Sequence, residues 1–169
     1  MRRSGCVAIV ALLVFVAGFS TLAIGADPQI EKEVKAFLDD YAKAYEKKDL
    51  AAVTAMVAPD ANVVLVDPGP KGRYVGPEQI KKSFENDFGQ FKSMTSKYTW
   101  VSVGAKGDLA WFVAESMSAV DMGEDKFNVP ARWTGLLEKR QGKWLLIQSH
   151  FSVVEPEMEP EPEAEKKPK

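Results

Sequence analysis

The chain has 169 residues, and its 22 Lys and Arg against 24 Asp and Glu give a formal net charge of −2 at pH 7. Nothing in this balance resembles the basic excess of proteins that bind nucleic acid or anionic membranes, so we expect neither partner. One histidine and one cysteine supply few ligands for a transition metal, and the carboxylates do not cluster in sequence. We therefore predict no metal and no cofactor.

Residues 1–26 have the pattern of a signal peptide. Arg2 and Arg3 precede an apolar run over 7–19, and Ala23 and Gly25 stand at the spacing that a signal peptidase reads. The alternative is an uncleaved membrane anchor, because the apolar segment is nearly long enough to span a bilayer. We predict a cleaved signal and a secreted or periplasmic protein, with no membrane contact after cleavage and without the only cysteine, Cys6.

Residues 155–169 form the other atypical end of the chain. They contain six Glu, three Lys and four Pro and almost nothing apolar. Such a segment buries too little surface to offset the entropy of ordering, so it is predicted to be a disordered tail. Residues 27–154 remain and are sufficient for one domain with its own hydrophobic core.

The first part of this domain reads as helices. The segment "QIEKEVKAFLDDYAKAYEKKDL", residues 29–50, repeats apolar side chains at helical spacing. Asp49 is placed to cap a short second helix, "LAAVTAMV", that stops before Pro59. "ANVVLVDP" then has the β-branched content of a strand, ended by a turn rich in Gly and Pro. Pro77 opens a third helix, which is predicted to reach Phe91.

From residue 96 onward the sequence predicts three or four long strands. Turn signals fall at "GAKGD", "MGEDK" and "RQGK". Three helices followed by an antiparallel meander indicate an α+β domain in which the helices cover one face of a curved sheet.

With these elements in this order, the chain resembles the SnoaL-like members of the nuclear transport factor two-like superfamily. The fragments that carry the resemblance are "YAKAYEKKDLAAVTAMVAPDANV", "VDPG…YVGPEQIKKSF", "GDLAWFVAE", "ARWTGLL" and "GKWLLIQSHFS". They cover residues 30–154. The resemblance implies a cone-shaped half-barrel, a pocket between sheet and helices, and a homodimer. It implies no single reaction, because this fold carries isomerases, dehydratases, binding modules and assembly domains.

Alternation along the last strand assigns its side chains to two faces. The more apolar set is expected to face the pocket and comprises Leu145, Ile147, Ser149, Phe151 and Val153. The other set comprises Trp144, Leu146, Gln148, His150 and Ser152. His150, the lone histidine, is therefore predicted on the outer face, although a strand bulge would reverse the facing.

A pair of short motifs connects this strand with its neighbour. Arg132 and Thr134 form an "RxT" pair, and His150 and Ser152 an "HxS" pair. Both pairs recur in SnoaL-like chains, and we predict that they meet on neighbouring strands. Because the outer sheet face often forms the dimer interface in this superfamily, these four residues are predicted to be interface or structural residues, and His150 is not the predicted base.

Likeness to the association domain of calcium/calmodulin-dependent kinase II, a member of the superfamily, points Trp111, Glu115 and Met117 inward. An inward glutamate is costly unless it is paired or protonated, which makes Glu115 a candidate catalytic acid or base. The alternative is a glutamate at the sheet edge that reaches solvent. The inward arginines of that association domain have no counterpart at Met117, Gly135 or Phe151, which implies an apolar ligand.

Ketosteroid isomerase, another relative, provides two further candidates. Tyr41 matches, by its spacing to "KDL", the tyrosine that donates to the oxyanion, and Asp67 resembles the general base in its "DP" context. The alternatives are a core aromatic residue for Tyr41, as for Tyr45, and a turn-forming acid for Asp67. The second, protonated acid of the isomerase has no counterpart in residues 133–135, so steroid isomerisation is not expected.

Two functions remain open at this point. One is a binding or assembly module for a small apolar or carbonyl-bearing molecule. The other is a cofactor-independent lyase or isomerase with Asp67 or Glu115 as base and Tyr41 as donor. The predicted pocket comprises Tyr41, Tyr45, Trp111, Glu115, Met117, Trp133 and Phe151.

Overall fold

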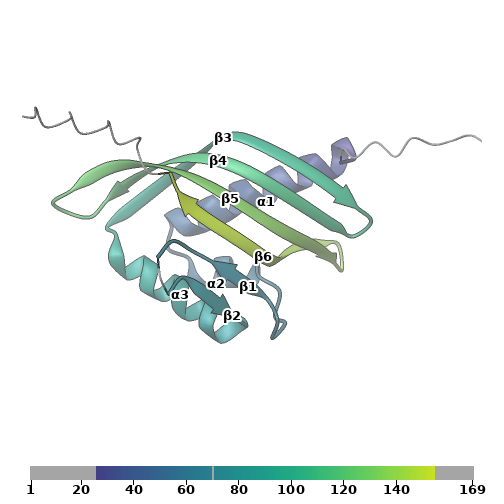
Figure 1. The fold of residues 1–169 in the computed structure, drawn as a ribbon, viewed down its shortest axis with the longest axis horizontal. Coiled ribbons are helices and arrows are strands. Elements are labelled where there is room, and N and C mark those ends of the chain that lie inside the picture. Colours follow the sequence, from purple (N-terminus) through teal and green to yellow (C-terminus); the bar gives the residue numbers. More distant parts are fainter. Residues whose placement is uncertain (1–25, 70, 155–169) are drawn as a thin grey trace, which may run out of the picture.

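The computed structural model describes residues 26–69 and 71–154 (Figure 1). Except for Ala26, the predicted signal peptide and the predicted tail lie outside these residues. The elements are α1 (Pro28–Glu46), α2 (Leu50–Ala55), β1 (Val64–Val66), β2 (Arg73–Val75), α3 (Pro77–Gln90), β3 (Ser93–Lys106), β4 (Leu109–Asp121), β5 (Lys126–Arg140) and β6 (Lys143–Val153). The predicted α+β class is confirmed, with the helices before the long strands.

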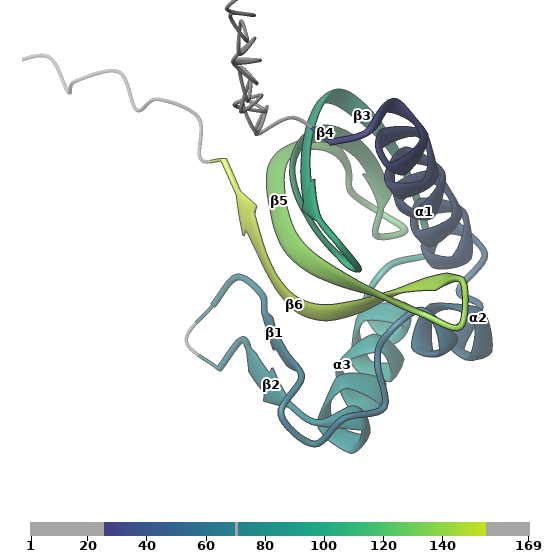
Figure 2. The same cartoon turned by 90° about the vertical axis from the view of Figure 1, so that its right-hand side faces the viewer.

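The strands form one sheet in the order β2-β1-β6-β5-β4-β3. Strands β3 to β6 make the predicted antiparallel meander. The sheet as a whole is mixed, because β1 lies parallel to β6 and antiparallel to β2. Figure 2 shows that the sheet curls strongly and that the helices lie within its concave side. This face is called the inner face below, and the opposite one the outer face.

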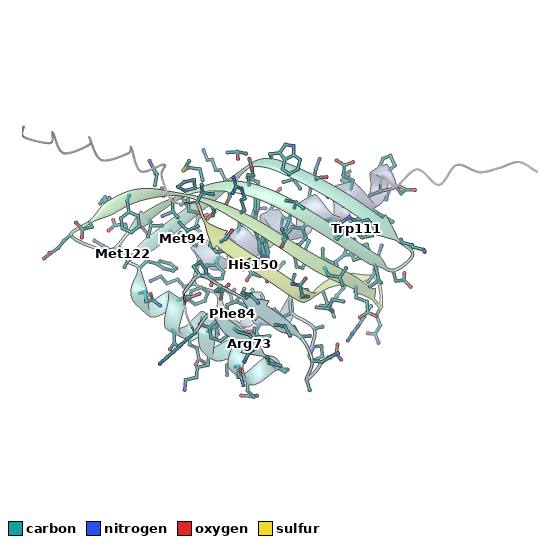
Figure 3. All side chains as sticks on the ribbon, in the orientation of Figure 1. Arg73, Phe84, Met94, Trp111, Met122 and His150 are labelled. Atoms are coloured by element: carbon teal, nitrogen blue, oxygen red, sulfur yellow. The ribbon has the colours of Figure 1, made fainter. Side chains whose placement is uncertain are left out.

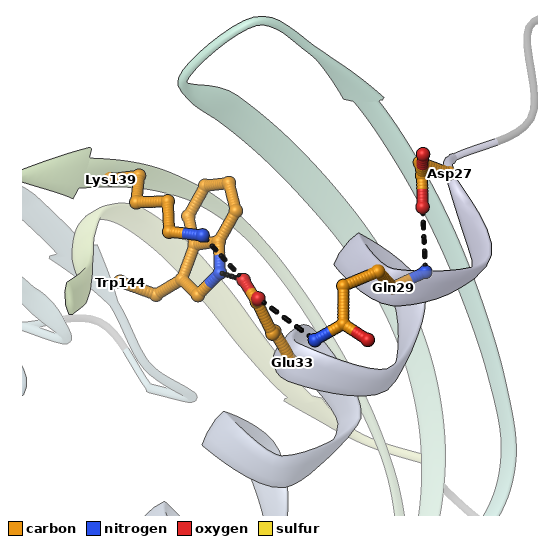
Figure 4. Close-up of polar contacts among 5 residues, drawn as sticks. All are labelled: Asp27, Gln29, Glu33, Lys139 and Trp144. Carbon is orange, nitrogen blue, oxygen red and sulfur yellow. Dashed lines mark hydrogen bonds and ion pairs between the residues drawn. The ribbon is translucent and has the colours of Figure 1, made fainter. Parts of the chain in front are cut away.

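Helix α1 is held at its N-terminal end by two acidic side chains (Figure 4). Asp27 caps the helix by accepting a hydrogen bond from the backbone N–H of Gln29 at 2.7 Å. The Glu33 carboxylate accepts from Lys139 Nζ at 2.6 Å and from Trp144 Nε1 at 2.9 Å. These hydrogen bonds lower the pKa of Glu33 to about 2 and connect the helix to the β5–β6 hairpin.

The two shorter helices follow the predicted start signals. Asp49 Oδ1 accepts from the backbone N–H of Ala52 at 3.0 Å, which confirms it as the cap of α2. Helix α3 begins at Pro77 as predicted. Lys48, in the left-handed region at φ 53°, donates to the carbonyls of Phe88 and Phe91 at the end of α3. The turn between α1 and α2 is thereby attached to the far end of the third helix.

A β-bulge in β6 corrects the predicted facing of this strand. Leu136 pairs with Gln148 while Leu137 pairs with Leu146, so Ile147 is the extra residue. The backbone of Leu146 also bonds to Met56 and Ala58, on the segment that leaves α2. Before the bulge, Trp144 and Leu146 are buried, and after it Ser149 is buried. The prediction that Leu145 and Ile147 face inward is therefore wrong, whereas it holds for Ser149 and Phe151.

Candidate functional site

A cavity of about 440 Å³ lies between the inner face of the sheet and the helices. Aromatic side chains form a large part of its wall: Tyr41, Tyr45, Tyr74, Phe84, Phe91, Tyr98, Trp133 and Phe151. Two carboxylates, Asp67 and Asp87, and four serines also line it. A space of this volume with a few polar groups on an aromatic wall has the character of a small-molecule site.

The aromatic rings pack against one another rather than standing singly. The Tyr41 ring lies 4.7 Å from Trp133 and 5.6 Å from Tyr45, between ring centroids. Tyr45 meets Phe84 edge-on at 5.9 Å. These contacts fix the side chains of α1 and α3 against β5, so the wall is formed before a ligand arrives. The predicted placement of Tyr41, Tyr45, Trp133 and Phe151 at the cavity agrees with this geometry.

Asp67 lies directly after β1, at the start of the turn to β2. Its backbone N–H donates to Gly72 O at 2.6 Å, and a Cβ at Gly72 would lie 2.1 Å from the carbonyl oxygen of Asp67, so only glycine fits there. The side chain faces the cavity. Burial, and then the charge of Asp87, raise the pKa of Asp67 from 3.8 to about 6.

Asp87 is a site residue that the sequence interpretation missed. It lies on α3 one turn after Phe84, on the side of the helix that carries Ile80 and Phe84. Its Oδ2 accepts a hydrogen bond from the Tyr45 hydroxyl at 2.7 Å. Burial raises the pKa of Asp87, and the hydrogen bond partly opposes this. The signal was present in the sequence, as a carboxylate at helical spacing within an apolar stripe.

The Tyr41 hydroxyl is the neutral donor of the site. Burial and then the charge of Asp67 raise the pKa of Tyr41 well above its usual value, so the hydroxyl keeps its proton at neutral pH. Within the described part of the chain, no hydrogen bond occupies it. By contrast, the neighbouring Tyr98 hydroxyl donates to Leu38 O at 3.3 Å, and Tyr45 is bound to Asp87.

The four serines come from the long strands. Ser96 and Ser118 face each other across β3 and β4, with their hydroxyl oxygens 2.7 Å apart, and Ser116 and Ser149 also line the cavity. The sequence interpretation missed Ser116 and Ser118 because it assigned β4 the opposite facing, and it assigned no facing to β3, which carries Ser96. Each hydroxyl can donate or accept, so this wall can bind a neutral polar group.

The prediction that Trp111, Glu115 and Met117 face the pocket is wrong. Phe112 is 1% exposed and packs in the core, whereas Trp111 is 40% and Met117 42% exposed on the outer face. Glu115 lies on the outer face as well, with Oε1 3.6 Å from Arg132 Nε and half of its side chain exposed. The alternative of a solvent-reaching glutamate is therefore correct, and no desolvated acid is present at this position.

The outer face also carries the lone histidine. His150 and Trp111, both labelled in Figure 3, are exposed there. Arg132 pairs with Ser152 and Thr134 with His150 across β5 and β6, which confirms the predicted meeting of the two motifs. His150 does not line the cavity.

The described residues contain neither a cluster of metal ligands nor a membrane-spanning helix. In 26–69 and 71–154, no group of three or more His, Cys, Asp or Glu side chains is placed to hold a metal ion. None of the helices in these same ranges has the length and apolarity to cross a membrane.

Comparison with known proteins assigns the family. The SnoaL-like domain family matches residues 34–156. The chain belongs to this family. A comparison with curated proteins finds no match.

Solved structures with this fold include several bacterial proteins. A proposed dehydratase of the nuclear transport factor 2-like family from Streptomyces avermitilis is 19% identical, with a TM-score of 0.69 over 77% of this chain and 100% of that one. A proposed calcium/calmodulin-dependent kinase II association domain from Xanthomonas campestris is 28% identical, with a TM-score of 0.67 over 80% and 94%. A superfamily member from Salmonella enterica is 15% identical, with a TM-score of 0.70 over 81% and 99%. These similarities establish the nuclear transport factor 2-like fold of this SnoaL-like protein.

Proposed function

We propose that this SnoaL-like protein binds a small, mainly apolar carbonyl compound in the cavity and moves a proton on it without a cofactor. Asp67 removes a proton from the carbon next to the carbonyl, and Tyr41 donates a hydrogen bond to the oxygen on which negative charge develops. The proton then returns to another carbon, as in an isomerase, or a leaving group departs, as in a lyase.

One observation carries this proposal: the Asp67 carboxylate faces an aromatic cavity that also holds the Tyr41 hydroxyl. Because the pKa of Asp67 is raised to about 6, the group is mostly ionised at pH 7 and is a stronger base than an ordinary aspartate. Tyr41 keeps its proton and has an unoccupied hydroxyl within the described residues. Structural neighbours described as proposed dehydratases, from Streptomyces avermitilis and Novosphingobium aromaticivorans, support the reaction class.

Deuterium exchange tests the proposal directly. Small arylketones such as phenylacetone and 2-indanone would be incubated with the protein in D₂O, and loss of the α-proton signal followed by NMR. We expect catalysed exchange that rises with pH through an apparent pKa near 6, because only ionised Asp67 acts as a base. Asp67→Asn should lower the rate by about 100-fold or more, and Tyr41→Phe by about 100-fold.

The matched control is Asp60→Asn, which changes an aspartate that pairs with Arg140 at 2.5 Å and does not line the cavity. Its exchange rate should equal that of the wild type. Equal rates in the wild type and Asp67→Asn would refute Asp67 as the base.

We propose a homodimer through the outer face as a second, compatible function. Its support is a group of exposed apolar side chains, Trp100, Trp111, Val113 and Met117, around the Glu115–Arg132 pair. A patch that holds both charge signs can be complementary to a second copy of itself. Arg132→Glu should shift the protein toward monomer in analytical ultracentrifugation. A wild type that is already monomeric would contradict the proposal.

A further inference from the structure

The cavity carries negative charge without a matching positive charge. Asp67 and Asp87 both line it, and the charge of Asp87 helps to raise the pKa of Asp67. Among the described lining residues there is no lysine, arginine or histidine. A ligand carboxylate or phosphate would therefore meet two like charges and no cationic side chain among the described lining residues, which disfavours anions.

Lys48 contacts Phe91, one of the lining residues, but its ammonium group is already engaged. Its ammonium lies 4.7 Å from the centroid of the Phe91 ring and donates to the carbonyls of Phe88 and Phe91. Lys48 does not line the cavity. The charge of the two aspartates is therefore left for solvent or for a ligand to neutralise.

The aromatic wall favours the same type of ligand. Tyr45 and Phe84 stand edge to face beside Asp87, with ring centroids 5.9 Å apart, and Phe91 and Trp133 extend the wall. Ring faces attract cations, and an ammonium group among aromatic side chains retains apolar contacts for its methyl or methylene groups. A carboxylate within such a wall adds a direct charge pair.

We propose that the ligand of this cavity carries an ammonium group, as a protonated amine or a quaternary ammonium, and that Asp87 is its counter-ion. Asp87 suits this role because the Tyr45 hydroxyl holds its carboxylate in place at 2.7 Å. Asp67 lies after β1 and accepts no such bond from the described residues, so it remains available for proton transfer. The inference rests on the proposed function in taking the cavity as the ligand site, and it narrows the substrate to an amine-bearing compound.

Three probes of similar shape test the charge preference. Phenyltrimethylammonium is cationic, tert-butylbenzene is its neutral isostere, and benzenesulfonate is anionic. Affinities would be measured by NMR titration at pH 7.5 with the full-length protein. We expect the cation to bind about tenfold more tightly than the neutral isostere, and the anion not to bind.

Asp87→Asn keeps an acceptor for Tyr45 and removes the charge. It should weaken binding of the cation by about tenfold and leave the affinity for the neutral isostere unchanged. The unchanged affinity would also show that the variant is folded. Asp60→Asn should change neither affinity.

The inference is overturned if the neutral isostere binds as tightly as the cation, if benzenesulfonate binds, if no probe binds, or if Asp87→Asn weakens both ligands equally. Failure of the proposed function would give a different result. The protein would still prefer the cation in the binding titration, but it would not catalyse exchange of the α-proton.

Discussion

Replacing Asp67 with asparagine should raise the free energy of unfolding at neutral pH. The gain over the wild type should be small at acidic pH. The carboxylate faces the cavity and has no basic neighbour among the described lining residues. Asparagine has nearly the same shape but cannot ionise. The turn itself should survive, because it is closed by the backbone bond from Asp67 N–H to Gly72 O.

The magnitude follows from the pKa. Folding raises the pKa of Asp67 from 3.8 to about 6, so folding favours the protonated form. That stabilisation is fully present below pH 3.8 and is lost as the pH rises through about 6. At about 1.4 kcal/mol for each pH unit, the wild type loses about 3 kcal/mol relative to Asp67→Asn over this window. The side chain is only half-buried by surface area, so about 3 kcal/mol is an upper bound.

Urea unfolding at pH 4, 5, 6, 7 and 8 measures the difference between the two proteins. Asp60→Asn is a control in which the stability should change in the opposite direction, because Arg140 holds the pKa of Asp60 below its usual value. Asp60→Asn should be destabilising above pH 4, and this loss should fade as the pH falls below that value. A difference between wild type and Asp67→Asn that is constant from pH 4 to 8 would refute the desolvation of Asp67.

Three other predictions concern the scaffold and export. Glu33→Gln should lower the melting temperature at pH 7, and the loss should shrink as the pH falls from 4.5 toward 2, because the low pKa of Glu33 reflects its bonds to Lys139 and Trp144. Gly135→Ala should destabilise the fold by about 1–3 kcal/mol in urea unfolding, because its Cβ would lie 2.6 Å from the Phe112 ring; an unchanged midpoint would contradict this packing. Mass spectrometry of the exported protein should show loss of the first 25 or 26 residues, whereas an intact chain in the membrane fraction would favour the anchor.

The helices were predictable because their signals are local. Asp49 caps α2 and Pro77 opens α3, as the sequence indicates. The three hairpin turns likewise follow from their glycines. Strand β2 was missed because its three residues lie just after a Gly- and Pro-rich turn and pair only with β1, in a register that no local pattern reveals.

The facing of the strands was harder to predict. In β4 both faces carry apolar side chains, with Phe112 and Ala114 inside and Trp111 and Val113 outside, so alternation gives no clear choice. The decisive constraint is packing: Phe112 is buried in the core on the inner face, whereas the Trp111 indole lies against Gly104 on the other side. In β6 the bulge lies beside Leu146, whose backbone bonds to the distant Met56 and Ala58, and sequence spacing does not reveal such a long-range contact.

The stability cost at Asp67 distinguishes the two interpretations of this residue. A residue needed only to form the turn could be asparagine, which suits turns equally well and has no charge to desolvate. The carboxylate makes no hydrogen bond with the described residues that would offset its burial. Its presence instead matches the requirement of a base, which needs a raised pKa in a partly dry site. Asp67→Asn should therefore gain stability and lose proton exchange together, and a variant that gained stability while keeping full exchange would leave the turn as the only role of Asp67.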